Sequence, residues 1–106
     1  MNREAYYQEH LWDCGIPEYM HSAILNYLLH RLQPGDFLLG VLSNDLAKAV
    51  GHADANNRGF LPNYVTFLYN YVPSECWGNE VKVLQWLSPK QEDPAEVQNG
   101  VGEEAE

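Results

Sequence analysis

The chain has 106 residues, of which 45% are hydrophobic and 12% aromatic, and it carries a formal net charge of −9. This length has room for one domain, and the composition differs from that of disordered proteins. Residues 91–106 hold six acidic residues and no base, which leaves nine acids and six bases in residues 1–90, a net charge of −3. Six dispersed bases form no basic stripe, so we expect no direct binding to nucleic acid.

The compartment can be predicted from three further features. The N-terminal residues contain no apolar run of the kind found in export signals. The longest strongly apolar stretch, residues 37–42, is too short to cross a bilayer. Two cysteines, Cys14 and Cys76, fit buried thiols better than a disulfide. We therefore expect a cytoplasmic protein that binds no membrane.

Apolar residues recur at helical spacing along most of the chain, and no segment shows the sustained alternation of a strand. A short helix is expected over residues 2–12, with Gly15 ending it. A stronger helix should follow from Pro17 to about residue 32, because proline is compatible with the first turn of a helix.

The middle of the chain predicts two helices separated by a bend. Residues 37–42 are apolar almost all round, which is typical of a buried helix. Ser43 and Asn44 favour a break, with Asn44 as the cap of the amphipathic helix that follows. One arc of that helix carries only apolar residues, Leu46, Ala49, Val50 and Ala53.

The last third of the body predicts a turn, a helix, a loop and a final short helix. The turn is expected at residues 56–59. Pro62 should lie in the first turn of a helix that continues to residue 72. Residues 73–78 are expected to form a loop before a short helix over residues 79–87.

These elements predict an all-α fold, a compact bundle of four to five short helices. The helical domain is expected to span residues 1–88. Residues 89–106 are polar and charged, and we expect them to form a disordered, flexible acidic tail.

One helix carries two stripes of functional interest. Asn44, Ala47, Gly51 and Asp54 would align, so that small residues admit a flat ligand or another backbone between two polar ends. The alternative is local: Asn44 caps its helix and Asp54 bonds to the following turn. The second stripe is a charged row, Asp45, Lys48 and His52, which most simply forms a solvated face.

The sequence offers little for catalysis or metal binding. His10, Cys14, His21 and Cys76 are residue types that bind zinc, but the break around residues 15–17 spoils their spacing. A glycine-rich phosphate loop and a Gly-x-Ser-x-Gly elbow are both missing. A cysteine nucleophile at Cys14 or Cys76 is a minor alternative. We expect a protein that is not an enzyme, with no catalytic residue, metal site or cofactor.

Thirteen aromatic residues are too many for the faces of such a small domain to hide. We expect some of the following to stay partly exposed unless the protein self-associates: Tyr6, Tyr7, Trp12, Tyr69 and Trp86. Tyrosine and tryptophan commonly anchor protein interfaces. Core packing and use in an interface are therefore both open for these aromatics, and we expect the protein to be a homo-oligomer.

A series of short motifs extends over residues 16–87. They are Ile16-Pro17-x-Tyr19-Met20, Pro34-Gly35-x-Phe37-Leu38, Val41-Leu42-x-Asn44-Asp45-Leu46, Ala53-Asp54-x-x-Asn57, Phe67-Leu68-Tyr69-Asn70, Pro73 and Trp77-Gly78. In this pattern the chain resembles a family of small uncharacterised proteins encoded by bacteriophages and prophages. The resemblance implies an accessory protein that works in the cytoplasm of a bacterial host.

The leading hypothesis is a non-catalytic phage protein that modulates a host process, such as defence, by binding a host protein. The alternative is a sponge that holds a small nucleotide signalling molecule between subunits. Candidate binding residues come from the motifs and from the polar stripes: Asn44, Asp45, Lys48, Gly51, Asp54, Asn57, Arg58, Tyr69, Asn70 and Trp77.

Overall fold

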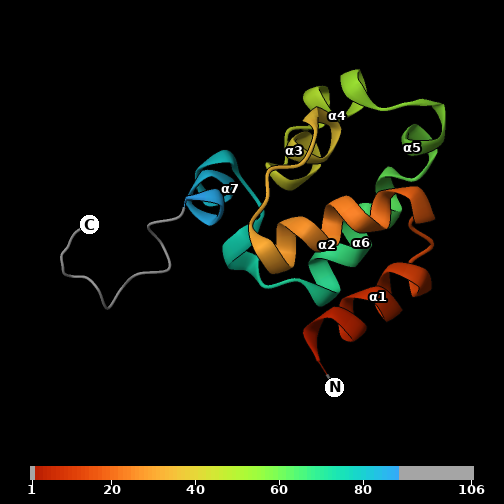
Figure 1. Cartoon of the computed structure of the whole chain (residues 1–106). Coiled ribbons are helices and arrows are strands. Elements are labelled where there is room, and N and C mark those ends of the chain that lie inside the picture. The colour runs from red at the N-terminus through yellow and green to blue at the C-terminus, as the bar shows by residue number, and fades with distance from the viewer. Residues whose placement is uncertain (1, 89–106) are drawn as a thin grey trace, which may run out of the picture.

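The computed structural model describes residues 2–88, and within this range the chain is all-α, as predicted (Figure 1). In chain order the α-helices are α1 (Arg3–Asp13), α2 (His21–His30), α3 (Asp36–Leu42), α4 (Leu46–His52), α5 (Ala55–Gly59), α6 (Leu61–Tyr71) and α7 (Glu80–Leu87). Short 3-10 turns precede two of them, η1 (Glu18–Met20) before α2 and η2 (Ser74–Cys76) before α7. None of the helices in this range is long and apolar enough to cross a bilayer.

The number of helices is higher than the predicted four to five. Residues 56–59, expected to be a turn, belong to α5. The expected loop over residues 73–78 contains η2, and the helix expected from Pro17 is divided into η1 and α2. The predicted acidic tail, residues 89–106, lies outside the described residues, so the boundary after residue 88 stays a prediction.

Polar side chains and left-handed residues set the helix ends. Asn2 accepts a hydrogen bond from Ala5 N at 2.7 Å and so caps α1. Gly15, with φ of +73°, ends α1: its N–H donates to Trp12 O, and Ile16 N–H donates to Leu11 O. This pair of bonds is a Schellman motif, which requires a left-handed residue after the helix and so favours glycine.

The bend between α3 and α4 is confirmed, but the role predicted for Asn44 is wrong. Asn44 has φ of +60°, and Asn44 and Asp45 donate backbone hydrogen bonds to Val41 O and Gly40 O. Asn44 therefore ends α3 as the left-handed residue of a second Schellman motif, a conformation that asparagine tolerates well. The cap of α4 is Asp45, which accepts a hydrogen bond from Lys48 N at 3.0 Å.

Helix α3 is largely buried in the core and contacts three other helices. Five of its seven residues are buried: Phe37, Leu38, Gly40, Val41 and Leu42. Helix α4 packs along α3, and α6 and α7 also contact it. Isolated helices of this length are unstable in water, so burial between neighbours is what stabilises α3.

Buried hydrogen bonds attach the C-terminal part of the described chain to this core. The hydroxyl of Tyr27, on α2, donates to Cys76 O at 2.7 Å. The indole N–H of Trp86, on α7, donates to Tyr27 O at 2.8 Å. In addition, Gly78 N–H donates to Leu42 O at 2.7 Å, which fixes the start of α7 against the end of α3.

Gly40 permits the close contact between α3 and α4. A Cβ atom at this position would lie 2.6 Å from Ala49 N and 2.9 Å from Ala49 Cα. Both of these are backbone atoms, so no side-chain rotation could relieve the overlap. Gly51, also helical, has no atom within 4 Å of its would-be Cβ.

We predict opposite effects for alanine at these two glycines. Gly40→Ala should lower the free energy of unfolding by about 1–3 kcal/mol, because the added methyl forces α3 and α4 apart. Gly51→Ala is the matched control and should raise it by about 0.5–1 kcal/mol, because alanine favours the helix. Urea denaturation followed by circular dichroism measures both. Equal stability of the two variants would contradict the close packing at Gly40.

Candidate functional site: a groove between α1 and α2

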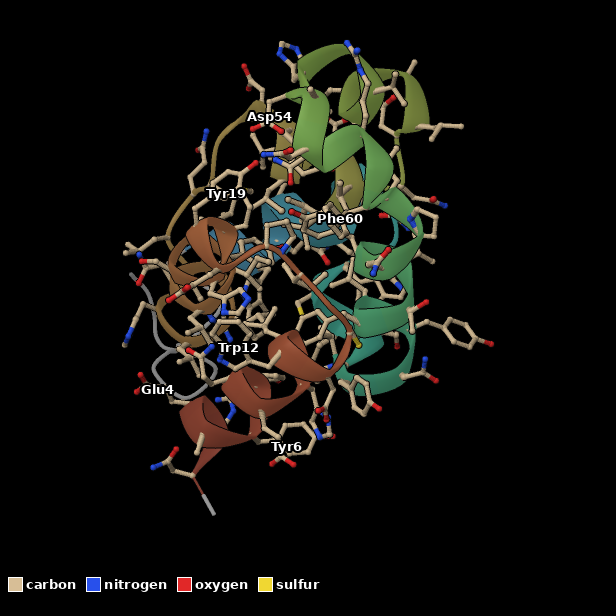
Figure 2. All side chains as sticks on the ribbon, turned by 90° about the vertical axis from the view of Figure 1, so that its right-hand side faces the viewer. Glu4, Tyr6, Trp12, Tyr19, Asp54 and Phe60 are labelled. Atoms are coloured by element: carbon tan, nitrogen blue, oxygen red, sulfur yellow. The ribbon has the colours of Figure 1, made fainter. Side chains whose placement is uncertain are left out.

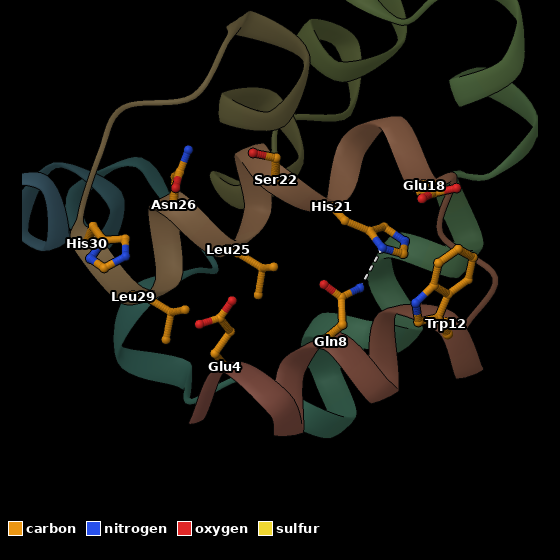
Figure 3. Close-up of a pocket in the computed structure, with 10 residues that line it drawn as sticks. All are labelled: Glu4, Gln8, Trp12, Glu18, His21, Ser22, Leu25, Asn26, Leu29 and His30. Atoms are coloured by element: carbon orange, nitrogen blue, oxygen red, sulfur yellow. Dashed lines mark hydrogen bonds between the residues drawn. The ribbon is translucent and has the colours of Figure 1, made fainter. Parts of the chain in front are cut away.

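An open groove of about 460 Å³ runs between α1 and α2 (Figure 3). Helix α1 contributes Glu4, Gln8 and Trp12 to its walls. Glu18 of η1 lies at one end. Helix α2 forms the opposite wall, with polar residues such as Ser22 and Asn26 beside the apolar Leu25 and Leu29. The groove therefore has both polar and apolar walls and could accept a segment of another molecule.

A buried histidine fixes the two walls relative to each other. His21 is 5% exposed, and its Nδ1 lies 2.8 Å from Gln8 Nε2 while its Nε2 lies 2.8 Å from Ile16 O. The tautomer with its proton on Nε2 satisfies both bonds, since Gln8 then donates to Nδ1 and Nε2 donates to the carbonyl. Together with the turn at Gly15, these bonds set the spacing of α1 and α2.

Trp12 and two carboxylates give the groove its chemical character. Trp12 is 53% exposed, and its ring meets the His21 ring edge-on at 4.7 Å between centroids. Glu4 and Glu18 are exposed at the groove, and Figure 2 shows Glu4 and Trp12 on the same side of the molecule. An exposed indole with the Glu18 carboxylate at the same end of the groove suits a cationic group, which can bind both by stacking and by ion pairing.

Among the aromatics, the prediction of partial exposure is confirmed. Tyr6, Trp12 and Tyr69 are 38%, 53% and 78% exposed, whereas Tyr7 and Trp86 are buried. Trp86 is covered by Arg31, whose guanidinium carbon lies 3.9 Å from the centroid of the indole ring. Trp12 is thus the one of these two tryptophans that can meet a ligand.

The predicted stripe of small residues is not continuous. Asn44 lies before the start of α4 and Asp54 lies after its end, where it caps α5 by accepting a hydrogen bond from Asn57 N at 2.7 Å. The local alternative is confirmed for Asp54. Gly51 is exposed, and the charged row is confirmed in part as a solvated face, since Asp45 and His52 are exposed and Lys48 is half-buried.

The other candidate residues lie apart from the α1–α2 groove. Tyr69 and Asn70 are exposed on α6, where Asn70 Nδ2 donates to Thr66 O one turn earlier. Arg58 is exposed on α5. Trp77 is half-buried beside η2, and its Nε1 is buried without a hydrogen-bond partner within the described residues. The structure does not bring the ten predicted residues together in one site.

Asn57 belongs to a polar network that joins α5 to α6 and η1. It is 4% exposed, and its Oδ1 accepts a hydrogen bond from the Tyr64 hydroxyl at 2.6 Å. Next to it, the Tyr19 hydroxyl donates to Asp54 Oδ2 at 2.7 Å, a contact that lowers the pKa of this carboxyl (Figure 2). These contacts give Asn57 and Asp54 a clear role in holding the short helix α5.

Two residues of α5 test this role. Asn57→Ala should lower the free energy of unfolding by about 1–3 kcal/mol, because the buried Tyr64 hydroxyl loses its acceptor. Arg58→Ala, at an exposed position of the same helix, should change it by less than about 0.5 kcal/mol. Thermal or urea unfolding provides the measurement. A stable Asn57→Ala protein would show that the network contributes little to the fold.

The thiols lack the properties of a nucleophile. Cys76 is fully buried, and this burial, with a smaller contribution from Glu75, raises its pKa to about 11. Burial also raises the pKa of Cys14, which is half-buried beside Asp13. A thiol that stays protonated at neutral pH is a poor nucleophile. Within residues 2–88 no three His, Cys, Asp or Glu side chains are grouped as a metal site.

We predict that Cys76 resists alkylation in the folded protein. In a Cys14→Ser background, iodoacetamide below pH 9 should label Cys76 only after denaturation, because the thiol is both inaccessible and protonated. The Cys76→Ala protein, which retains the half-buried Cys14, provides the comparison and should react faster. Mass spectrometry counts the added groups. Rapid labelling of native Cys76 would restore a cysteine nucleophile as a candidate.

Sequence reasoning did not identify the groove itself. It found Trp12 as an aromatic that could remain exposed, but Glu4, Gln8 and Glu18 were not among its candidates. The signal in the sequence was Trp12 together with two acidic residues, Glu4 before and Glu18 after Gly15, the glycine that ends α1. Comparisons with protein-family models, with curated proteins and with solved structures give no match. The resemblance to phage-encoded proteins therefore stays a prediction.

Proposed function

We propose that this protein is a non-catalytic binding protein that engages a basic segment of another protein in the groove between α1 and α2. The observation that carries this proposal is the exposed Trp12 in a 460 Å³ groove that Glu4 and Glu18 also line. A binding role accounts for the exposure of the Trp12 indole and of the two carboxylates at the same groove.

The chemistry of the groove favours an arginine or lysine side chain of the partner. A guanidinium can stack on the open face of Trp12 while its N–H groups donate to a carboxylate such as Glu18. The apolar Leu25 and Leu29 of α2 can cover the aliphatic part of such a side chain. The net charge of −3 in residues 1–90 would also speed the encounter with a basic surface.

The resemblance to phage-encoded proteins supports a bacterial protein as the partner, met in the host cytoplasm. Small accessory proteins in that setting often act by occupying a surface that a host protein needs. We therefore propose that binding through the groove modulates a host process, with defence as the process first to be examined. This step is an analogy of biological context, and it is independent of the chemistry of the groove.

The nucleotide alternative has weaker support. The pocket that Asn44 and Asp45 line contains no lysine, arginine or histidine among its described lining residues. Asp45 and Asp54 would repel a phosphate, whereas phosphate sites usually offer positive charge. Calorimetry with a panel of cyclic nucleotides separates the two ideas, since heat of binding from any member would favour the sponge.

The binding proposal can be tested on the groove directly. Immobilised wild-type protein should retain a partner from bacterial lysate, and should also bind arginine-rich peptides with an affinity that falls as salt rises. Trp12→Ala and Glu18→Lys should each weaken both interactions by about tenfold or more, since each removes one recognition group. Fluorescence anisotropy of labelled peptides gives the affinities.

Matched controls lie elsewhere on the surface. Tyr69→Ala removes an exposed aromatic of α6, and Glu75→Lys reverses an exposed carboxylate of η2. Neither should alter binding. If all four variants retain the same partner and peptides as the wild type, the groove is not the binding site. If the wild-type protein retains nothing, the binding function itself is wrong.

A further inference from the structure

The α1–α2 groove has a carboxylate at each end. Figure 3 shows Glu18 at the same end as Trp12, and Glu4 at the other end, on the side of Leu29. Both glutamates are exposed, and neither forms an ion pair within residues 2–88. The stacking and pairing proposed for one basic side chain use only the Trp12 end, which leaves Glu4 to receive a second basic group.

The two ends are separated by about two turns of α1. Glu4, Gln8 and Trp12 follow one another at intervals of four residues, so they lie along one side of the helix. At a rise of about 1.5 Å per residue, Glu4 and Trp12 are about 12 Å apart along the helix axis. On the opposite wall, Leu25 and Leu29 are also four residues apart, and both are half-buried. The groove therefore runs lengthwise between two helices.

We propose that the groove binds a helix of the partner that carries two basic residues seven positions apart. The first of them stacks on Trp12 and pairs with Glu18. The second pairs with Glu4, and an apolar residue between the two covers Leu25. Positions i and i+7 lie on one side of a helix and are about 10.5 Å apart, a difference from 12 Å that a long arginine or lysine side chain can span. This inference rests on the proposed function and adds the form and spacing of the segment that is recognised.

The walls of the groove favour a helical segment over an extended one. Both walls are α-helices, whose backbone N–H and C=O groups are bonded within each helix except at its ends. They therefore offer no open edge to which an extended segment could add as a strand. A helix satisfies its own backbone groups and needs only side-chain contacts from the groove, with anchors at spacings such as i, i+4 and i+7.

The charges around the groove are compatible with a second basic group. Its lining contains no lysine or arginine among the described residues. Arg3, next to Glu4 in sequence, does not line the groove, and its guanidinium carbon lies 6.0 Å from the centroid of the Tyr7 ring. Of the two lining histidines, His21 has both ring nitrogens in hydrogen bonds, and His30 is exposed at the end of α2. Binding is best measured near about pH 8, where imidazole groups in general carry no charge.

Peptides of identical composition and net charge test the spacing. Each has about 15 residues, mostly alanine and glutamine with one leucine and two arginines, and a lactam bridge on the far side holds it helical. The full-length wild-type protein should bind the peptide with arginines at i and i+7 at least about threefold more tightly than one with arginines at i and i+5. In the second peptide the two arginines point in different directions, so only one can reach a carboxylate of the groove. Fluorescence anisotropy gives the dissociation constants.

Two variants of α1 test which carboxylate receives the second arginine. Glu4→Gln should weaken binding of the i, i+7 peptide about three- to fivefold, the contribution of one exposed ion pair, and should not affect a peptide that has only the first arginine. Glu9→Gln is the matched control, because Glu9 is exposed on the same helix but does not line the groove. It should change either affinity by less than about twofold. Circular dichroism checks that both variants are folded.

Two results would overturn recognition at two points. One is equal affinity for the two arginine spacings, and the other is an equal effect of Glu4→Gln and Glu9→Gln on the i, i+7 peptide. Both leave the proposed function intact if Trp12→Ala still weakens peptide binding. Failure of every peptide to bind the folded wild-type protein would contradict the proposed function, and this inference with it.

Discussion

The contact of Gly40 with the backbone of Ala49 is the constraint on which the architecture depends. It lets α4 lie directly on α3, with 2.6 Å between a would-be Cβ and Ala49 N. With α4 on one side and α6 and α7 on others, the seven-residue α3 becomes the centre of the fold. A larger side chain would separate the two helices, and Ala49 of α4 would lose its place in the core. The chain thus builds a core from helices that are too short to be stable alone.

The aromatic side chains divide into a buried set and an exposed set. The hydrogen bonds of Tyr27, Tyr64 and Trp86 are made inside the protein, and those of Tyr27 and Trp86 join elements far apart in sequence. Trp12 and Tyr69 contribute far less to the core, because more than half of each side chain is exposed. They lie on different helices and in different chemical surroundings, one beside carboxylates and one on an uncharged helix.

Much of the fold could be predicted from local signals, and the remainder depended on contacts between segments. The stop at Gly15 and the periodicity of α6 are properties of short stretches, and the helices that they predict are present. Helix α5 was missed because Asn56-Asn57-Arg58-Gly59 has the composition of a turn; its conformation is held by Asp54 and by the hydrogen bond from Tyr64 of the next helix. The exposure of Leu46 could not be predicted either, since it depends on how α4 lies on α3. The groove joins Glu4 to Glu18 across fourteen positions, and only the turn at Gly15 brings the two together.

The bonds of His21 to Gln8 and to Ile16 have a consequence for the thermodynamics of association. They connect both walls of the groove to the turn between them, so the groove is ordered by contacts within the protein itself. A preorganised surface loses little conformational entropy on binding, and more of the contact energy is then available for affinity. In the proposed complex the main ordering cost would fall on the basic segment, so a segment already held in a rigid helix or turn would bind more tightly than a flexible one.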